Sequence, residues 1–150
     1  LEKYEMKATI NYITSKLGSD SYFNLDQMKE MRQSEWMSIE SHTVSHLDLN
    51  TLEDSHIESE LLDSKKWIDE ESKNWIEKEL EQTTTLLCYP AGRYDERVIK
   101  SAEETGYKMA VTTEPGYASK SDGLYTLKRV RVSPGYDGES FGQYMLAFEL

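Results

Sequence analysis

The chain has little of several features that mark special classes of protein. It has a single cysteine, Cys88, among 150 residues, so it forms no internal disulfide and is not a disulfide-stapled mini-domain. No apolar run approaches the ~20 residues that a membrane-spanning helix needs. Lysine and arginine are scattered and the formal net charge is −11, so we expect no nucleic-acid partner.

The first residues also lack a secretory signal, because no basic region followed by an apolar segment is found there. Leu1 to Met6 instead resemble the last turns of a helix that runs directly into the strand-like segment Lys7–Ile13. A natural protein rarely begins inside a helix. We therefore expect residues 1–150 to be one domain whose first strand and helix are missing.

Short β-branched segments alternate with helical patterns along the rest of the chain. Strands are predicted over Lys7–Ile13, Trp36–Ile39, Thr83–Tyr89, Met109–Thr112 and Leu127–Val132. Helices are predicted from Asn24, from Thr51 (with Asp54 three residues later as the second residue of the start motif) to Trp75 with allowance for a break near Glu70–Lys73, and from Asp95 to Gly106. This alternation predicts an α/β domain with a parallel sheet or barrel wrapped by helices.

His42 and His46, two of the three histidines, stand four residues apart in the segment Ser41–His46 (Ser-His-Thr-Val-Ser-His). The segment follows a predicted strand, where the ligand-bearing loops of α/β proteins are built. The spacing brings both imidazoles to one side of a helical turn, where they can bind one metal ion, and the neighbouring hydroxyl groups are available to orient the rings. Two partly exposed loop histidines without a ligand are the competing interpretation.

Followed by Leu47-Asp48-Leu49, this segment resembles the second motif of the polysaccharide deacetylase family (the NodB-homology domain, carbohydrate esterase family 4). In that family the motif H-[ST]-x-x-H supplies two of three protein ligands of a metal ion. The resemblance implies a distorted (β/α) barrel of about seven strands, slightly fewer than the eight of a TIM barrel, here incomplete at the N-terminus. It also implies that His42 and His46 bind Zn²⁺ or another divalent transition metal.

A second segment, Leu87–Asp95, is similar to the third motif of the same family. The resemblance implies that Tyr89, Pro90, Ala91, Gly92 and Arg93 form one wall of the substrate groove, with the Ala91 amide directed at the developing oxyanion. Arg129, in the late segment Leu127–Val132, is a further candidate for the groove. The competing interpretations are an ordinary turn at Tyr89–Gly92 and an amphipathic strand with outward basic residues at Leu127–Val132.

The chain departs from the family pattern at three places. It has no Asp-Asp pair, so the base aspartate and the third metal ligand are expected upstream of Leu1. The arginine that many relatives carry in the third motif near the position of Cys88 is absent, so Arg93 or Arg129 would have to orient the base. No histidine follows His56, which leaves the proton donor to the leaving amine unassigned. We expect His56 to be a surface residue and Cys88 to be a buried packing residue rather than a zinc ligand.

Together these features predict a metal-dependent hydrolase that removes N-acetyl groups, less often O-acetyl groups, from a cell-wall or extracellular polysaccharide. With two metal ligands, the 150 residues alone are expected to be inactive. A non-catalytic glycan-binding relative is the alternative. Tyr89, Tyr94, Tyr107 and Tyr136 are candidates for stacking on sugars, although tyrosine is also common in cores. The family implies an extracellular or cell-surface location, and the residues predict no particular oligomeric state.

Overall fold

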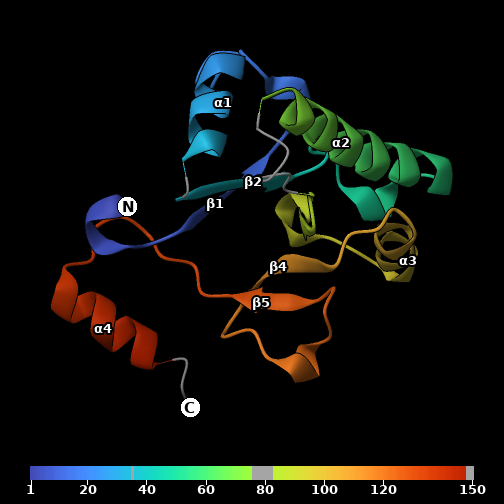
Figure 1. Ribbon diagram of the computed structural model, residues 1–150. Helices are drawn as coiled ribbons and strands as arrows, with labels where there is room; N and C mark the ends of the chain where they lie inside the picture. The colour runs from blue at the N-terminus through green and yellow to red at the C-terminus, as the bar shows by residue number, and fades with distance from the viewer. Residues whose placement is uncertain (35, 76–82, 148–150) are drawn as a thin grey trace.

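The computed structural model describes residues 1–34, 36–75 and 83–147, which form a sheet with helices packed against it (Figure 1). The strands are β1 (Ala8–Tyr12), β2 (Met37–Ser41), β3 (Leu86–Cys88), β4 (Met109–Pro115) and β5 (Leu127–Arg129). The α-helices are α1 (Leu25–Gln33), α2 (Asp54–Trp75), α3 (Glu96–Glu104) and α4 (Gly138–Leu146). Among the described residues, no helix is both long enough and apolar enough to cross a membrane.

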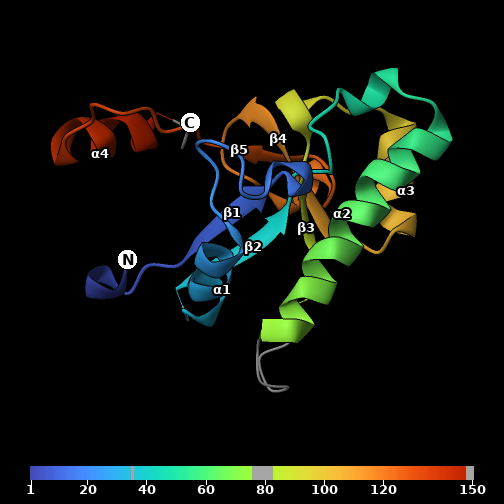
Figure 2. The ribbon, with the colours of Figure 1, turned by 90° about the horizontal axis from the view of Figure 1, so that it is seen from above.

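The five strands lie side by side in chain order, and every neighbouring pair is parallel. Because crossovers between parallel strands are right-handed, a sheet in sequential order carries its connecting helices on one face. Figure 1 shows α1 and α2 above β1 and β2, and Figure 2 shows α2 alongside α3. This arrangement is a sector of a (β/α) barrel, which confirms the predicted fold class.

The alternation of side chains along β1 and β2 separates the two faces of the sheet. Tyr12 and Ile39 are buried on the face that packs against α1 and α2. Thr9 and Ser38 face the opposite side, where their hydroxyl oxygens lie 2.8 Å apart. The two strands pair in register along their whole length, so the segment that leaves the end of β2 starts next to Tyr12.

The start of α1 and both ends of α3 lie where the sequence predicts them. The Asn24 side chain accepts from the Gln27 amide at 3.0 Å, and Gln27 Oε1 accepts from the Asn24 amide at 2.9 Å, which completes the capping box of α1. Asp95 caps α3 by accepting from the Val98 amide at 3.0 Å. Gly106 follows the C-cap of α3 with a φ of 87°, the left-handed conformation that glycine adopts without strain.

The long helix α2 is continuous from Asp54 to Trp75, so the break considered near Glu70–Lys73 does not occur. The segment contains neither proline nor glycine, the usual causes of a kink. The helix begins at Asp54 rather than Thr51, because Thr51 belongs to a preceding 3₁₀ turn. Its apolar stripe is buried as predicted at Ile57, Leu61 and Ile68, and the side chain of Trp75 lies outside the described residues.

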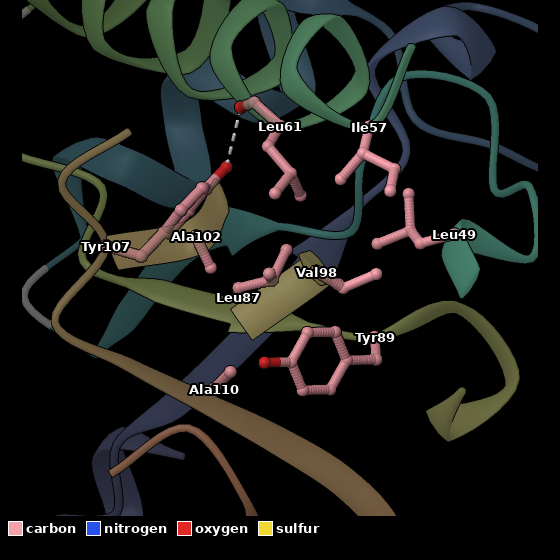
Figure 3. Packing of buried hydrophobic residues seen from close by; sticks show 9 residues of the cluster. All are labelled: Leu49, Ile57, Leu61, Leu87, Tyr89, Val98, Ala102, Tyr107 and Ala110. Carbon is pink, nitrogen blue, oxygen red and sulfur yellow. Dashed lines mark hydrogen bonds between the residues drawn. The ribbon is translucent and has the colours of Figure 1, made fainter. Parts of the chain in front are cut away.

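The larger hydrophobic cluster packs α2 and α3 onto β3 and β4 (Figure 3). It consists of Leu49, Ile57, Leu61, Leu87, Tyr89, Val98, Ala102, Tyr107 and Ala110. The Tyr107 hydroxyl donates to the main-chain oxygen of Leu61 at 3.0 Å, which satisfies its only polar group inside the core. The cluster therefore fixes the segments that leave the ends of β2 and β3.

Several segments differ from the prediction. Leu1–Met6 contains a short 3₁₀ turn instead of the end of an α-helix. Of Thr83–Tyr89 only Leu86–Cys88 is strand, because the amides of Thr85 and Leu86 donate to the Glu40 carboxylate, each at 2.8 Å. Helix α4 was not predicted; none of its described side chains is buried, and Figures 1 and 2 show it apart from α1, α2 and α3.

Candidate metal centre

His42 and His46 lie in the loop that leaves the C-terminal end of β2. The His42 amide donates to the Tyr12 carbonyl at 2.9 Å, which extends the β1–β2 ladder one step beyond the strand. The loop then turns sharply, with left-handed φ values of 68° at Thr43 and 59° at His46. The imidazole centroids come to lie 4.6 Å apart, with the ring planes at 78°. The rings converge as expected, but a tight loop produces the convergence, not a helical turn.

Hydrogen bonds to the main chain hold this loop in place. The Ser45 amide donates to Glu60 Oε2 at 2.8 Å, and Glu60, on α2, is only 4% exposed. The His46 amide donates to Thr43 Oγ1 at 3.1 Å, and the Thr43 amide donates to Ser41 Oγ at 3.2 Å. The hydroxyl groups of Ser41 and Thr43 therefore fix the backbone of the loop, instead of contacting the rings as the motif had suggested.

A main-chain carbonyl orients the His42 ring. His42 Nδ1 lies 2.6 Å from the carbonyl oxygen of Cys88 on β3. A carbonyl oxygen only accepts, so Nδ1 donates and Nε2 keeps its lone pair for a metal ion. Burial lowers the pKa of His42; the charges of His46 and Arg129 add to this lowering, and the bond to Cys88 opposes it. The fold thus favours the neutral imidazole, which is the form that binds metals.

The two rings are candidates for part of a metal site. Zn²⁺ in catalytic sites is commonly bound by three protein ligands and a water molecule. In the part of the chain that the structure describes, no three His, Cys, Asp or Glu side chains are grouped so that they could hold an ion. The donor set of His42 and His46 therefore fits Zn²⁺, or another transition metal that takes imidazole, as two of its ligands.

The turn Pro90–Gly92 follows β3 directly after Cys88 and Tyr89. A Cβ on Gly92 would lie 2.1 Å from Thr113 Oγ1 and 2.7 Å from Thr113 N, so only glycine lets β4 pack this closely. The Gly92 amide donates to the Tyr89 carbonyl at 2.9 Å, whereas the amide of the exposed Ala91 has no hydrogen-bond partner among the described residues. An exposed amide without a partner among the described residues, next to a candidate metal site, is a suitable donor to an oxyanion.

Two arginines reach this region from different sides. Arg93 pairs with Asp48 and so links the turn to the loop that follows His46; the side chains are 58% and 36% exposed, which places the pair on the rim. Arg129 Nε donates to the Thr112 carbonyl at 2.6 Å. The Arg129 charge acts on the pKa of His42, in addition to the larger effect of burial. Arg129 therefore lies near the histidines, whereas Arg93 belongs to the rim.

The sequence profile of the polysaccharide deacetylase family matches residues 1–110, which include both the histidine loop and the Pro90–Gly92 turn. The chain belongs to this family. The resemblance carried by Ser41–His46 and Leu87–Asp95 is thereby confirmed.

Individual deacetylase relatives match most of the chain. The protein YxkH of Bacillus subtilis (strain 168), which carries the same family name, is 50% identical over 145 residues, 97% of this chain and 49% of that protein. The poly-β-1,6-N-acetyl-D-glucosamine N-deacetylase of Staphylococcus epidermidis is 28% identical over 142 residues, 89% of this chain and 48% of that protein. The structure of the Streptococcus pyogenes deacetylase PplD in complex with acetate superposes on this chain with a TM-score of 0.85 and a sequence identity of 39%. The match covers 97% of this chain and 61% of that one. The chain spans about half the length of the curated relatives it matches.

Two of the four tyrosines expected to stack on sugars lie inside the core of this deacetylase domain. Tyr89 and Tyr107 are 0% and 1% exposed, so the prediction was wrong for their rings (Figure 3). Alternation from Leu87 places Tyr89 on the helix-facing side of the sheet, which the turn motif alone did not reveal. Tyr94 is half-buried, and its ring stacks on that of Tyr89 with 5.0 Å between centroids. Tyr136 is 40% exposed. Tyr94 and Tyr136 therefore stay candidates for stacking on sugars.

Cys88 and His56 lie where the sequence analysis expected them. Cys88 is buried, and burial raises the pKa of its thiol, which disfavours the thiolate that a metal would need. His56 is exposed on α2. Asp48 and Glu60 also support the site but were not among the predicted residues. The signal for Glu60 was an acidic side chain on the apolar stripe of α2, and the signal for Asp48 was its place directly after the histidine motif.

Proposed function

We propose that the chain is part of a metal-dependent hydrolase that removes N-acetyl groups from a cell-wall or extracellular polysaccharide. One observation carries the proposal. The ring centroids of His42 and His46 lie 4.6 Å apart, and His42 Nδ1 donates to the Cys88 carbonyl, so that its Nε2 lone pair is available to a metal ion. Zn²⁺ is the ion we propose, because neutral imidazole is among its usual ligands, and another divalent transition metal would also fit.

When bound, such an ion polarises an acetyl carbonyl and lowers the pKa of a bound water molecule toward ~7. The residues of the chain contribute the surroundings. The Ala91 amide, which has no partner among the described residues, is available to donate to the oxyanion that develops on the acetyl carbonyl oxygen, and the close packing of Gly92 on Thr113 fixes that amide in the turn. The Arg93–Asp48 pair holds the turn and the histidine loop together at the rim.

We propose that the third metal ligand and the base aspartate come from sequence outside residues 1–150. Two facts support this: the described residues hold no group of three metal-binding side chains, and the chain spans about half the length of its curated relatives. With two ligands, the 150 residues alone are expected to bind zinc weakly and to release no acetate. No residue of the chain is proposed as the general acid.

The name of the Staphylococcus epidermidis relative supports the substrate class, because it specifies removal of the acetyl group from the nitrogen of a glucosamine polymer. We propose the same type of bond here, the amide of a 2-acetamido sugar within a polysaccharide. The exposed Tyr136 and the half-buried Tyr94 are the aromatic rings available to such a glycan. A substrate of this size outside the cell implies an extracellular or cell-surface location.

The test uses the full-length protein that contains these residues. Acetate release from an N-acetylglucosamine polymer is measured with Zn²⁺, after treatment with a chelator, and after zinc is restored. His42→Ala and His46→Ala are each expected to lower the rate by about 100-fold or more, with loss of bound zinc. His56→Ala, at the exposed histidine of α2, is the matched control. Wild-type zinc content in the double variant of His42 and His46 would exclude this site.

A non-catalytic glycan-binding protein is the second candidate. It is favoured by the lack of a third metal ligand in the described part of the chain and by the lack of any histidine after His56. Such a protein would bind the polymer equally well with and without a chelator and would release no acetate. Metal-dependent acetate release by the full-length protein selects the enzyme.

A further inference from the structure

A hollow at the end of β5 carries positive charge that the proposed reaction does not use. It has a volume of about 360 Å³ and is lined by Thr113, Arg129, Val130, Arg131 and Val132, at and beyond the end of β5. Sites for small molecules usually measure ~300–1,000 Å³. Thr113 Oγ1 also donates to the Ala91 carbonyl at 3.4 Å, so the hollow borders the turn that carries the proposed oxyanion donor.

Among the residues that the structure describes, neither arginine of the hollow has a carboxylate partner. Arg129 Nε donates a hydrogen bond to the Thr112 carbonyl. No ion pair among the described residues involves Arg129 or Arg131. This stands out in a chain with 28 acidic and 17 basic residues, where the exposed Arg93 and Arg97 are both paired with aspartates. Unpaired guanidinium groups present planar sets of donors that match carboxylate and phosphate oxygens.

We propose that this hollow binds an anionic substituent, a carboxylate or a phosphate, that the glycan carries near the sugar to be deacetylated. The inference rests on the proposed function and adds the substrate class: an anionic glycan, not a neutral N-acetylglucosamine homopolymer. Arg129 and Arg131 hold the anion, and Val130 and Val132 offer apolar surface beside them.

The position of the hollow agrees with a ligand that continues from the deacetylation site. It borders Ala91 through Thr113. At Arg131, the Tyr144 hydroxyl of α4 donates to the main-chain carbonyl at 2.6 Å, and the Tyr136 ring stacks on the Tyr144 ring with 4.9 Å between centroids. A glycan whose anion lies on the arginines therefore has an aromatic surface within reach for a neighbouring sugar.

The first experiment measures binding apart from turnover. Full-length protein, treated with a chelator, is titrated with three tetrasaccharide probes: neutral N-acetylglucosamine, a peptidoglycan strand with lactyl carboxylates, and N-acetylglucosamine carrying one phosphate monoester. We expect at least one anionic probe to bind about tenfold tighter than the neutral probe, with an advantage that shrinks as salt is added. The comparison of the two anionic probes identifies which anion the site takes. Equal affinity for all three probes would overturn the proposal.

Variants in β5 and just beyond its end locate the effect. Arg131→Gln is expected to remove most of the roughly tenfold preference, and Arg131→Lys to retain only part of it, because lysine keeps the charge without the paired donors. Lys128→Gln is the matched control: Lys128 lies on β5, does not line the hollow, and pairs with Asp122 at 3.9 Å. Equal loss of preference in Lys128→Gln and Arg131→Gln would show a general charge effect and reject the site.

The anion site and the deacetylase function fail separately in this design. Metal-dependent acetate release without any preference for anionic probes rejects the hollow as a binding site and keeps the enzyme. A preference for anionic probes that depends on Arg131, without acetate release, keeps the hollow and selects the non-catalytic glycan-binding protein.

Discussion

His42 Nδ1 donates a hydrogen bond of 2.6 Å to the main-chain oxygen of Cys88. The bond joins the loop after β2 to the last residue of β3, next to Ser41↔Leu87, the residue pair that links these two strands in the described part of the sheet. Because the acceptor belongs to the backbone, the orientation of the ring depends on the path of β3 and not on the side chain at position 88. The ring is therefore oriented by the fold, before any ion binds.

Replacing the Cys88 side chain tests this relationship. In Cys88→Ala the main-chain acceptor is retained, so we expect the zinc affinity of the full-length protein to stay within about twofold of the wild type. The cost to stability is expected to be about 1 kcal/mol, for the loss of a small buried group. Zinc affinity is measured by competition with a chelator, with His42→Ala as the positive control. A fall of about 100-fold in Cys88→Ala would instead make the thiolate a ligand.

The lowered pKa of His42 gives a pH dependence with a defined sign. Burial lowers this pKa, so the unfolded chain binds more protons than the folded chain between the lowered value and ~6.5. The contribution of His42 to stability is therefore fully present above ~6.5 and is lost as the pH falls through the lowered pKa.

The Arg129 charge is one of the smaller causes of that lowering, so Arg129→Gln is expected to move the His42 pKa back up toward its ordinary value. NMR titration of the imidazole signals in metal-free protein measures the change, and Lys128→Gln on the same strand is the control. An unchanged or lower His42 pKa in Arg129→Gln would show that the guanidinium does not act on this ring.

Gly92 and Gly18 form a matched pair for testing the turn. Their φ values are 69° and 68°, but a Cβ at Gly92 would collide with Thr113, whereas a Cβ at Gly18 would meet nothing within 4 Å. Gly18→Ala is expected to cost about 1–2 kcal/mol from the left-handed backbone alone. Gly92→Ala is expected to cost a further ~1–3 kcal/mol, because β4 must move away from the turn. Denaturant unfolding measures both values, and equal costs would show that the close approach of Gly92 to Thr113 is unimportant.

The parts of the fold that the sequence predicts well are those determined by local patterns. The capping box at Asn24 and Gln27, the cap at Asp95 and the glycine at 106 each act within one turn of helix, so the residues alone set the ends of α1 and α3. The buried stripe of α2 follows from the helical period.

The parts that could not be predicted depend on contacts between distant segments. Glu60 reaches the Ser45 amide from α2, and the Cys88 carbonyl reaches His42 from β3, so spacing along the chain shows neither contact. The left-handed backbone at Thr43 and His46 replaces the expected helical turn, because Ser41 and Glu60 bind the loop amides. The Tyr89 ring faces the core because of the strand that precedes it, although its motif suggested a groove.

The buried carboxylate of Glu60 provides the last test of how the histidine loop is held. It accepts the Ser45 amide at 2.8 Å, one residue before His46, and it is nearly inaccessible to solvent. Glu60→Ala leaves that amide unpaired and frees the loop, so the two imidazoles are no longer held 4.6 Å apart. We expect zinc affinity in the full-length protein to fall by about 10–100-fold, as for other residues that support metal ligands.

Glu58→Ala, at an exposed position of the same helix, removes the same charge without touching the loop and is the matched control. If both variants weaken zinc binding equally, the effect of Glu60 is one of charge. If only Glu60→Ala does so while the unfolding temperatures of the two variants agree, the hydrogen bond to the Ser45 amide is what keeps His46 beside His42. That distinction matters because the charge of a carboxylate acts over several ångströms, whereas the left-handed turn at His46 depends on an acceptor at one fixed position.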